Sequence, residues 1–469
     1  MDPSRADLLL RPLIQKMDAA GVPALTQGQF ARHFTQLVAG STGEVAEADI
    51  SPVDDIPNWS GLESASCSPE ILARAVVIKL NGGLGTTMGL SKAKSLLPLK
   101  DGATFLDILA QQAAYVSERA GAHVPLVFMN SNRTHEDTLD ALKGYPALRE
   151  GGLPLGFVQA TVPKVLKDGL GPAEWPSDPS RTWCPPGHGG IYSSLKESGL
   201  LDSLLDADYQ YAFVSNADNL GAVLDTGMLG WFAASGAPFL MEVCPRTAAM
   251  RKGGHLARRH DGRLILREKA QVPEADMEAF QDHQRHGYFN TNNIWVNLSA
   301  LKARLDGSEP LSLPLIRNEK LLVPTDPSSP PVYQLESAMG AAIEAFDGSL
   351  ALLVPRTRFA PVKTTGDLLL IRSDAFALDE TASMVPAAGC VSDKVLVSLD
   401  DRYYKHMADL DRRFPDGVPS MKGCSSLKIT GDVTFGRGVV LKGDVVIETG
   451  ATPQMLPAGS VVEGHLVLS

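Results

Sequence analysis

The run AVVIKLNGGLGTTMG occupies residues 75–89 and joins a short apolar segment to a cluster of glycines. An apolar run of this length, with several β-branched residues, predicts a buried strand. Glycines directly after such a strand let backbone N–H groups approach an anion closely, because no Cβ intervenes. The stretch therefore predicts a strand that ends in a phosphate-binding loop.

The loop matches neither of two common phosphate-binding fingerprints. No Gly-Lys-Ser/Thr follows at the Walker A interval, and Met88 occupies the third glycine position of the dinucleotide fingerprint. A plain strand-to-loop turn needs only one or two glycines. Here four glycines and two threonines precede Lys92 and Lys94, which favours phosphate binding over a plain turn.

Short apolar runs and longer amphipathic segments alternate around this loop. Residues 104–121 have helical spacing with a glycine at the end and predict a helix. Further strands are predicted at residues 124–129, 211–215, 238–243 and 293–298. Strands that alternate with helices indicate βαβ units and a mostly parallel sheet. The fold class is therefore α/β.

The two ends of the chain differ from this middle part. Residues 1–70 predict an N-terminal helical segment that carries no readable motif, and residues 71–380 predict the main domain. Within the predicted C-terminal domain, 381–469, short strands recur with Gly-Asp turns between them. This loose repeat resembles the coils of a left-handed β-helix; the alternative is a small β-sandwich or a pair of hairpins. The apolar positions of the repeat are Ile429, Val433, Phe435, Val439, Leu441, Val445 and Ile447.

Composition narrows the class of partner. A formal net charge of −11 argues against nucleic acid, because a nucleic-acid binder needs a basic surface. No run reaches the ~18 apolar residues that span a bilayer, so no membrane partner is expected. Five scattered cysteines without CxxC spacing fit free thiols in a reducing compartment. We therefore expect a cytoplasmic protein with small-molecule substrates.

Several long motifs together resemble the eukaryotic-type UTP–glucose-1-phosphate uridylyltransferases, within the nucleotide-sugar pyrophosphorylase superfamily. The resemblance runs from about residue 70 to the C-terminus. Two positions depart from the family pattern: Ala93 stands where the family has proline, and Gly190 where it has aspartate. In family order, the motifs are KLNGGLGTTMG (79–89), KSLL (94–97), CPPGHGG (184–190), SNADNLGA (215–222), MEVCPRTAAMRKGG (241–254), EKAQVP (268–273), FNTNNIWVNL (289–298), QLESAMGAAI (334–343) and VPRTRFAPVKTTGDLLL (354–370).

The resemblance implies a Rossmann-like, GT-A-like nucleotidyltransferase with a mixed sheet. It also implies that the enzyme converts UTP and glucose 1-phosphate into UDP-glucose and pyrophosphate. The sugar phosphate attacks the α-phosphorus of UTP in line, with Mg²⁺ as cofactor. Two anions must meet in such a site, so it needs basic side chains, a divalent metal and backbone N–H groups. Homo-oligomers could form through the C-terminal β-helix.

The resemblance also assigns residues. It implies that Lys94 and Lys363 contact the phosphates as catalytic residues and that Asp218 binds Mg²⁺; the structural alternative for Asp218 is a helix cap. The implied nucleotide-binding residues are Leu80, Gly82, Gly83, Gln159, Gly187, Asn216 and Asp218. The implied sugar-phosphate-binding residues are His188, Asn219, Gly254, Glu268, Asn290 and Asn292. The structural alternative for the Asn-Thr-Asn-Asn run at 290–293 is a turn that enters a strand.

Three other functions stay open at this point. The protein could be a pyrophosphorylase for N-acetylhexosamine or other sugar phosphates, although the FNTNN and KTTGDLL segments look closest to the glucose enzymes. It could be a hexapeptide-repeat acyltransferase, but the repeat is short and His465 is a poor catalytic candidate. It could be a binding protein that has lost turnover, which only the departures at Ala93 and Gly190 favour.

Overall fold

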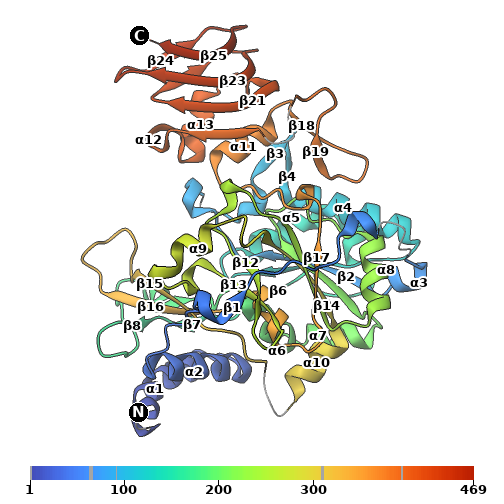
Figure 1. Ribbon diagram of the computed structural model, residues 1–469, viewed down its shortest axis with the longest axis vertical. Helices are drawn as coiled ribbons and strands as arrows, with labels where there is room; N and C mark the ends of the chain where they lie inside the picture. Colours follow the sequence, from blue (N-terminus) through green and yellow to red (C-terminus); the bar gives the residue numbers. More distant parts are fainter. Residues whose placement is uncertain (1–2, 63–66, 91, 308–310, 392–394, 469) are drawn as a thin grey trace.

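The structure is a computed structural model that describes residues 3–62, 67–90, 92–307, 311–391 and 395–468. A large sheet flanked by helices forms the middle of the molecule (Figure 1). The N-terminal helices α1 (Pro3–Ala19) and α2 (Ala24–Val38) lie at one end, and the C-terminal strands lie at the other.

The central sheet of the described chain is mixed, as the family resemblance implies, whereas the alternation of strands and helices alone predicted a mostly parallel sheet. Its main path runs β1-β12-β14-β10-β2-β5-β6, with β13 beside β12 and with β11 and β17 on the far side of β14. Strand β14 is antiparallel to β10, β11 and β12. A strand buried on both faces has the same apolar pattern whatever the direction of its neighbour, so periodicity could not reveal this. The bounds are β1 Ile50–Ser51, β2 Ala75–Asn81, β5 Leu126–Asn130, β6 Gly156–Val158, β10 Tyr211–Asn216, β11 Phe239–Pro245, β12 His255–Arg259, β13 Leu264–Arg267, β14 Tyr288–Asn297 and β17 Leu350–Leu353.

Helices cover both faces of the sheet. Val77 of β2 packs in one apolar cluster with helix α4 (Phe105–Ala120), whereas Val76 and Ile78 pack in another with α6 and α7. Thr104 and Asp107 form a capping box at the start of α4, and Gly121 ends the helix at φ +59°, as the sequence predicts. The remaining helices are α3 Pro69–Leu72, α5 His135–Ala141, α6 Ile191–Glu197, α7 Leu200–Asp206, α8 Thr226–Ser235, α9 Met277–Gln281, α10 Leu298–Asp306, α11 Thr365–Arg372, α12 Asp401–Tyr404 and α13 Met407–Arg413.

The strand directions bring the motif loops to one edge of the sheet. Strands β2, β5 and β10 are parallel and end there, and β11 is parallel to β17. Because β14 runs the other way, it begins at this edge, and His255 at the start of β12 pairs with Phe289 beside it. Ligands of α/β sheets bind in the crevice outside the carboxyl ends of the strands. The loops at this edge therefore define the region to search for a site.

Helices α1 and α2 pack against short strands beside the sheet. Leu13, Met17 and Phe34 share an apolar cluster with Val162 and Cys184. No helix within the described ranges is both long and apolar enough to cross a membrane. The smaller strands are β3 Pro98–Lys100, β4 Ala103–Thr104, β7 Val162–Pro163, β8 Val165–Leu166, β9 Trp183–Cys184, β15 Ile316–Leu321, β16 Pro331–Glu336, β18 Phe376–Leu378 and β19 Met384–Pro386.

The C-terminal strands form two parallel groups. One sheet has the order β20 (Leu396–Leu399), β21 (Ser420–Thr430), β23 (Val440–Thr449) and β25 (Val461–Leu468). A second group pairs β22 (Val433–Phe435) with β24 (Gln454–Leu456), also in parallel. Every apolar position of the predicted repeat is buried, from Ile429 to Ile447. Parallel pairing disagrees with a pair of hairpins, whose strands would be antiparallel.

Candidate active site

A pocket of about 370 Å³ lies at the carboxyl edge of the sheet, and we call it the Lys94 pocket. It is open to solvent and collects residues from the glycine loop, the end of β10 and the Cys-Pro-Pro-Gly-His-Gly-Gly loop. Its lining residues include Leu80, Gly82, Gly83, Lys94, Gln159, Gly187, His188, Asn216, Asp218 and Glu336. The pocket thus brings together every predicted nucleotide-binding residue, one predicted catalytic lysine and the predicted metal ligand.

Lys94 and Asp218 form an ion pair in this pocket. The Lys94 Nζ lies 2.6 Å from Asp218 Oδ2, and the two side chains are 15 % and 25 % exposed. Lys94 also donates to the carbonyl oxygen of Val362, and the Val362 N–H donates to the carbonyl oxygen of Asp218 at 3.1 Å. A partly buried pair interacts more strongly than a surface pair, because less water screens it. Three segments far apart in the sequence therefore meet at one lysine.

Lys363 follows Val362 and is exposed at the same edge. Its Nζ lies 5.8 Å from the centre of the Phe359 ring. Lys363 is also close enough to Glu268 to favour the ionised form of that carboxyl group. Lys363 is not among the residues that line the Lys94 pocket. It lies between this pocket and the second group of predicted site residues.

Glycines bring backbone close to side chain in the wall of the pocket. A Cβ added at Gly82 would lie 2.8 Å from Gln159 Nε2, whereas one added at Gly83 would meet nothing within 4 Å. Gly187 has φ +78°, and an added Cβ there would lie 2.3 Å from the Ser337 carbonyl oxygen. Gly187 is thus needed for close packing against the Ser337 backbone, whereas Gly82 faces only the end of the flexible Gln159 side chain and Gly83 leaves open space.

His188 is held as a neutral hydrogen-bond donor. The Met339 N–H donates to His188 Nδ1 at 3.0 Å, so the neutral ring carries its proton on Nε2. Burial lowers the pKa of His188 to about 4. The neutral ring therefore offers its Nε2–H as a hydrogen-bond donor and carries no positive charge. Gly190, two residues on, lies against the Pro186 ring, since an added Cβ would be 2.7 Å from Pro186 Cγ.

Four predicted sugar-phosphate-binding residues form a second group, the Glu268 cluster: Gly254, Glu268, Asn290 and Asn292. An added Cβ on Gly254 would lie 2.6 Å from the Glu268 carboxyl group, and Gly254 accepts a hydrogen bond from the Asn290 N–H at 3.1 Å. Asn290 Nδ2 donates to Asn292 Oδ1 at 2.9 Å. Burial raises the pKa of Glu268, although a hydrogen bond from Asn290 and the charge of Lys363 oppose the shift.

A bulge in β14 creates the Glu268 cluster. Glu242 pairs with Asn293 and Val243 with Asn290, so Thr291 and Asn292 are extra residues in the ladder. Asn292 has φ +57°, a left-handed conformation that asparagine tolerates better than most residues. The Asn-Thr-Asn-Asn run is thus a bulge inside a strand, not a turn before it, and β14 begins at Tyr288 instead of the expected residue 293.

Asn219 is brought to the same edge but is buried within the protein. Its Nδ2 donates to Asn293 Oδ1 at 3.1 Å and to the Arg358 carbonyl oxygen at 3.0 Å. Its Oδ1 accepts from the Ala360 N–H at 2.9 Å. These bonds favour a structural role for the side chain, and its contact with a sugar phosphate stays a prediction.

Sequence reasoning missed several charged residues in and below the site. Glu336 lines the Lys94 pocket and accepts from Asn318 Nδ2 at 2.8 Å. Glu242, Arg358 and Lys79 are buried below the loops. The sequence did hold a signal for two of them, since Lys79 lies inside the apolar run AVVIKL and Glu242 inside PFLMEV. Charged side chains are rarely buried without a partner, so each indicates a buried polar contact.

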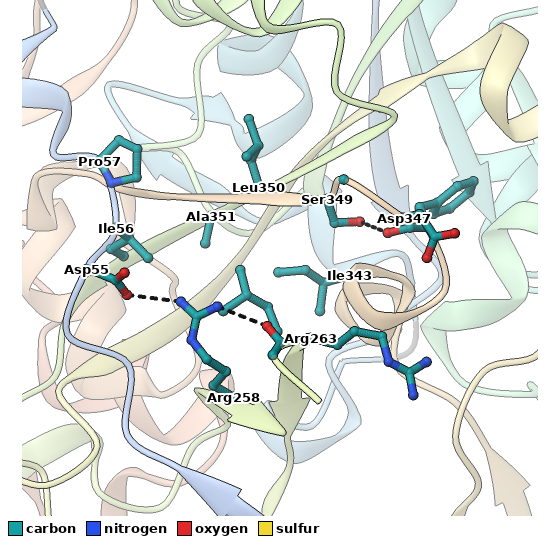
Figure 2. A pocket seen from close by; sticks show the side chains of 14 residues that line it. Asp55, Ile56, Pro57, Arg258, Arg263, Ile343, Asp347, Ser349, Leu350 and Ala351 are labelled. Carbon is teal, nitrogen blue, oxygen red and sulfur yellow. Dashed lines mark hydrogen bonds and ion pairs between the residues drawn. The ribbon is translucent and has the colours of Figure 1, made fainter. Parts of the chain in front are cut away.

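A second hollow of about 330 Å³ lies away from these motifs (Figure 2). Both arginines that line it already pair within the protein. Arg258 donates to Asp55 and to the Gly262 carbonyl oxygen, each at 3.0 Å, and Arg263 lies 2.6 Å from Asp261. It contains none of the predicted site residues, so the Lys94 pocket is the better candidate for chemistry.

Comparisons with known proteins show the family of the chain. A family model described as UTP–glucose-1-phosphate uridylyltransferase matches residues 27–442. The UTP–glucose-1-phosphate uridylyltransferase of Hordeum vulgare is 39 % identical over 404 residues, covering 86 % of this chain and 83 % of the relative. The enzyme of that name from Saccharomyces cerevisiae is 37 % identical over 440 residues, or 93 % and 87 % of the two chains.

Solved structures show the same likeness in three dimensions. A UDP-glucose pyrophosphorylase from Leishmania major has a TM-score of 0.92 and 40 % identity, covering 98 % of this chain and 99 % of that one. The protein described as UDP-glucose phosphorylase from Trypanosoma brucei has a TM-score of 0.90 and 41 % identity, with coverages of 98 % and 100 %. A variant of the Leishmania protein was solved in complex with UDP-glucose.

Proposed function

Because the chain belongs to the UTP–glucose-1-phosphate uridylyltransferase family, we propose that it joins UTP and glucose 1-phosphate into UDP-glucose and pyrophosphate. The observation that carries the proposal is the meeting of three groups at one edge of the sheet. The glycine wall, the Lys94–Asp218 pair and the Glu268 cluster lie where a nucleotide, a polyphosphate and a sugar would have to adjoin.

In the proposed reaction, a phosphate oxygen of glucose 1-phosphate attacks the α-phosphorus of UTP in line. The new P–O bond forms as the bond to pyrophosphate breaks, so no covalent enzyme intermediate is needed. Gln159 and the backbone of Gly82, Gly83 and Gly187 hold the uracil end. This binding orients the triphosphate before the reaction, so that a bimolecular step becomes effectively unimolecular.

Two lysines supply positive charge to the reacting phosphates. Lys94 exchanges its contact with Asp218 for the phosphates and stabilises the negative charge that develops on pyrophosphate. Lys363, exposed beside the Glu268 cluster, contacts the phosphate of the sugar. The neutral His188 donates through Nε2 without adding a charge that would compete with either lysine.

Asp218 fits the magnesium ion that we propose as cofactor. Magnesium is bound through one or two carboxylates together with substrate phosphates and water, and Asp218 places a part-exposed carboxylate in the pocket. Among the described residues no three acidic, histidine or cysteine side chains gather as a ligand set. When bound, the ion would neutralise phosphate charge.

The Glu268 cluster supports glucose as the sugar. Acceptors on Glu268, Asn290 and Asn292 and donors on the two amides match a ring that carries several hydroxyl groups. Because Asn290 and Asn292 now bond each other, a sugar must replace those bonds with its own. A site built for hydroxyl groups rejects analogues that lack them, since its polar groups are left unpaired.

Two broader proposals concern the whole molecule. We propose that the parallel C-terminal strands form a left-handed β-helix and that self-association occurs through its end strand β25, where Val461 and Val467 are 61 % and 64 % exposed. We also propose a cytoplasmic location, because Cys184 and Cys244 are buried free thiols, which fit a reducing compartment.

The function is tested with purified protein, UTP, glucose 1-phosphate and Mg²⁺, while pyrophosphate and UDP-glucose are both followed. We expect equimolar release of the two products and none without a divalent ion. Parallel reactions contain galactose 1-phosphate or N-acetylglucosamine 1-phosphate. Faster turnover of either would contradict glucose as the substrate, and absence of turnover with every sugar would contradict the enzymatic function.

A further inference from the structure

A buried ion pair lies below the three loops of the site. Glu242 on β11 is completely buried, and its carboxylate accepts from Arg358 Nε at 2.7 Å and from Arg358 Nη2 at 2.6 Å. Trp295 Nε1 and Asn293 Nδ2 donate to the same carboxylate at 2.9 and 3.0 Å. The fork of the guanidinium group matches the carboxylate in two places, which fixes direction as well as distance.

The backbone of Arg358 joins this pair to two loops. The Arg358 carbonyl oxygen accepts from Asn219 Nδ2 at 3.0 Å and from Asn293 Nδ2 at 3.1 Å. A Cβ added at Gly221 would lie 2.2 Å from the Thr357 carbonyl oxygen, so the chain at 357–358 is pressed against the loop after β10. The segment that leads to Lys363 is therefore anchored by Asn219 and Asn293, which directly follow Asp218 and Asn292 in the sequence.

Lys79 secures the other side of the same loop. Its Nζ donates to Ser215 Oγ at 2.7 Å and to the Ala222 carbonyl oxygen at 2.6 Å, and it is completely enclosed below the glycine loop. Lys79 Nζ and the Arg358 guanidinium group both lie 5.6 Å from the centre of the Phe213 ring. The residues 215–222, which include Asp218, are thus held from two directions by the buried Lys79 side chain and the Arg358 segment.

A purely structural role does not explain this arrangement well. Well-packed apolar residues often replace a buried ion pair with no loss of stability, because the charges must be taken out of water. Apolar residues in place of Glu242 and Arg358 would not hold the Arg358 carbonyl group in a fixed direction. That direction sets how far Lys363, Asp218 and the Glu268 cluster lie from one another.

We propose that Glu242 and Arg358 are positioning residues, which fix the Lys363 loop relative to Asp218 and to the Glu268 cluster so that the two phosphates meet in line. The inference rests on the proposed function, since it concerns the geometry of that reaction. Neither side chain lines the Lys94 pocket, so they act through the groups that they hold.

The variant Arg358→Lys tests the proposal, because it keeps the charge and removes the two-pronged contact. A misplacement of about 1 Å at reacting groups costs about 10²-fold in rate, so we expect kcat to fall between about 10-fold and 100-fold. The KM for UTP should stay within about twofold, because Gly82, Gln159 and Gly187 lie on other loops. A second variant, Asn293→Ser, keeps both charges and removes the amide between them, and should cause a smaller loss of the same kind.

Arg413→Lys is the matched control. Arg413 is also buried, and its Nε lies 2.7 Å from Asp432 Oδ1 in the C-terminal part of the chain. Thermal unfolding and the full kinetics are measured for all four proteins. The proposal is supported if Arg358→Lys and Asn293→Ser lose kcat while Arg413→Lys keeps the wild-type kcat at a similar loss of thermal stability. Wild-type kcat in the Arg358 and Asn293 variants would overturn it, whereas an inactive wild type would contradict the proposed function itself.

Discussion

The Lys94 pocket and the Glu268 cluster lie side by side but are built differently. Part of the wall of the pocket is backbone, at Gly82, Gly83 and Gly187, and Gly83 faces open space. The Glu268 cluster is built from side chains, and Asn290 and Asn292 already bond each other. The first region is shaped by sterics, and the second by exchangeable hydrogen bonds.

This difference suggests how each region selects its ligand. Backbone changes little on binding, so we expect the glycine part of the wall to select a flat base by its shape. A side-chain cluster gives up internal hydrogen bonds and therefore gains only when the ligand replaces each of them. Lys94, paired with Asp218, lies in the pocket, and Lys363, exposed over Phe359, lies between the pocket and the cluster.

The largest loss of activity is expected for the lysine in the pocket. In Lys94→Met the reacting phosphates lose a positioned cation, and kcat should fall between about 10²-fold and 10³-fold. Lys92→Met removes the same charge from an exposed position in the same loop and should stay near the wild type. Steady-state kinetics of both variants measure the contrast. Equal losses would mean that only the general charge of the loop matters.

A somewhat smaller effect is expected on the metal side of the pocket. Asp218→Asn keeps the size of the side chain but removes the negative charge, so kcat should fall about 10²-fold and more Mg²⁺ should be needed for half-maximal rate. A magnesium titration of the variant beside the wild type measures this. Unchanged magnesium dependence would contradict Asp218 as the ligand.

The smallest effect concerns stability below the pocket. Burial lowers the pKa of Lys79 to about 7 from its ordinary 10.5, with repulsion from Arg358 adding to the shift and attraction by Glu242 opposing it. Between those values the unfolded chain binds more protons than the folded chain, so stability rises with pH. Lys79→Met should lack this rise, which is at most about 1.4 kcal/mol for each pH unit. Urea unfolding of the two proteins across this pH range measures it, and identical slopes would contradict the prediction.

The sequence predicted the local elements of the site well, because their signals are local. The apolar run before the glycines is β2, Thr104 and Gly121 bound helix α4, and Gln159, Gly187 and Asp218 line one pocket. Each of these depends on a few adjacent residues or on a motif quoted from the chain. The functional roles of the residues in the pocket stay predictions.

Long-range pairing could not be predicted in the same way. Nothing in the apolar run of β14 shows that it is antiparallel to β10, since both faces are buried. The bulge that places Asn292 depends on its register with Glu242, more than forty residues earlier in the chain. The Arg358–Glu242 pair joins residues still further apart, and neither side chain signals its partner in sequence.

The division between the two regions is tested most directly by one kinetic comparison of Gly83→Ala with Glu268→Gln. An added methyl group at Gly83 meets no protein atom within 4 Å, so any loss must come from the ligand. We predict that Gly83→Ala raises the KM for UTP about tenfold and leaves that for glucose 1-phosphate unchanged, as expected for a steric loss of a kcal/mol or more. Glu268→Gln should raise the KM for glucose 1-phosphate and leave the KM for UTP unchanged. If both variants weakened the same substrate, or if Gly83→Ala weakened neither, the two regions would not divide the substrates between them.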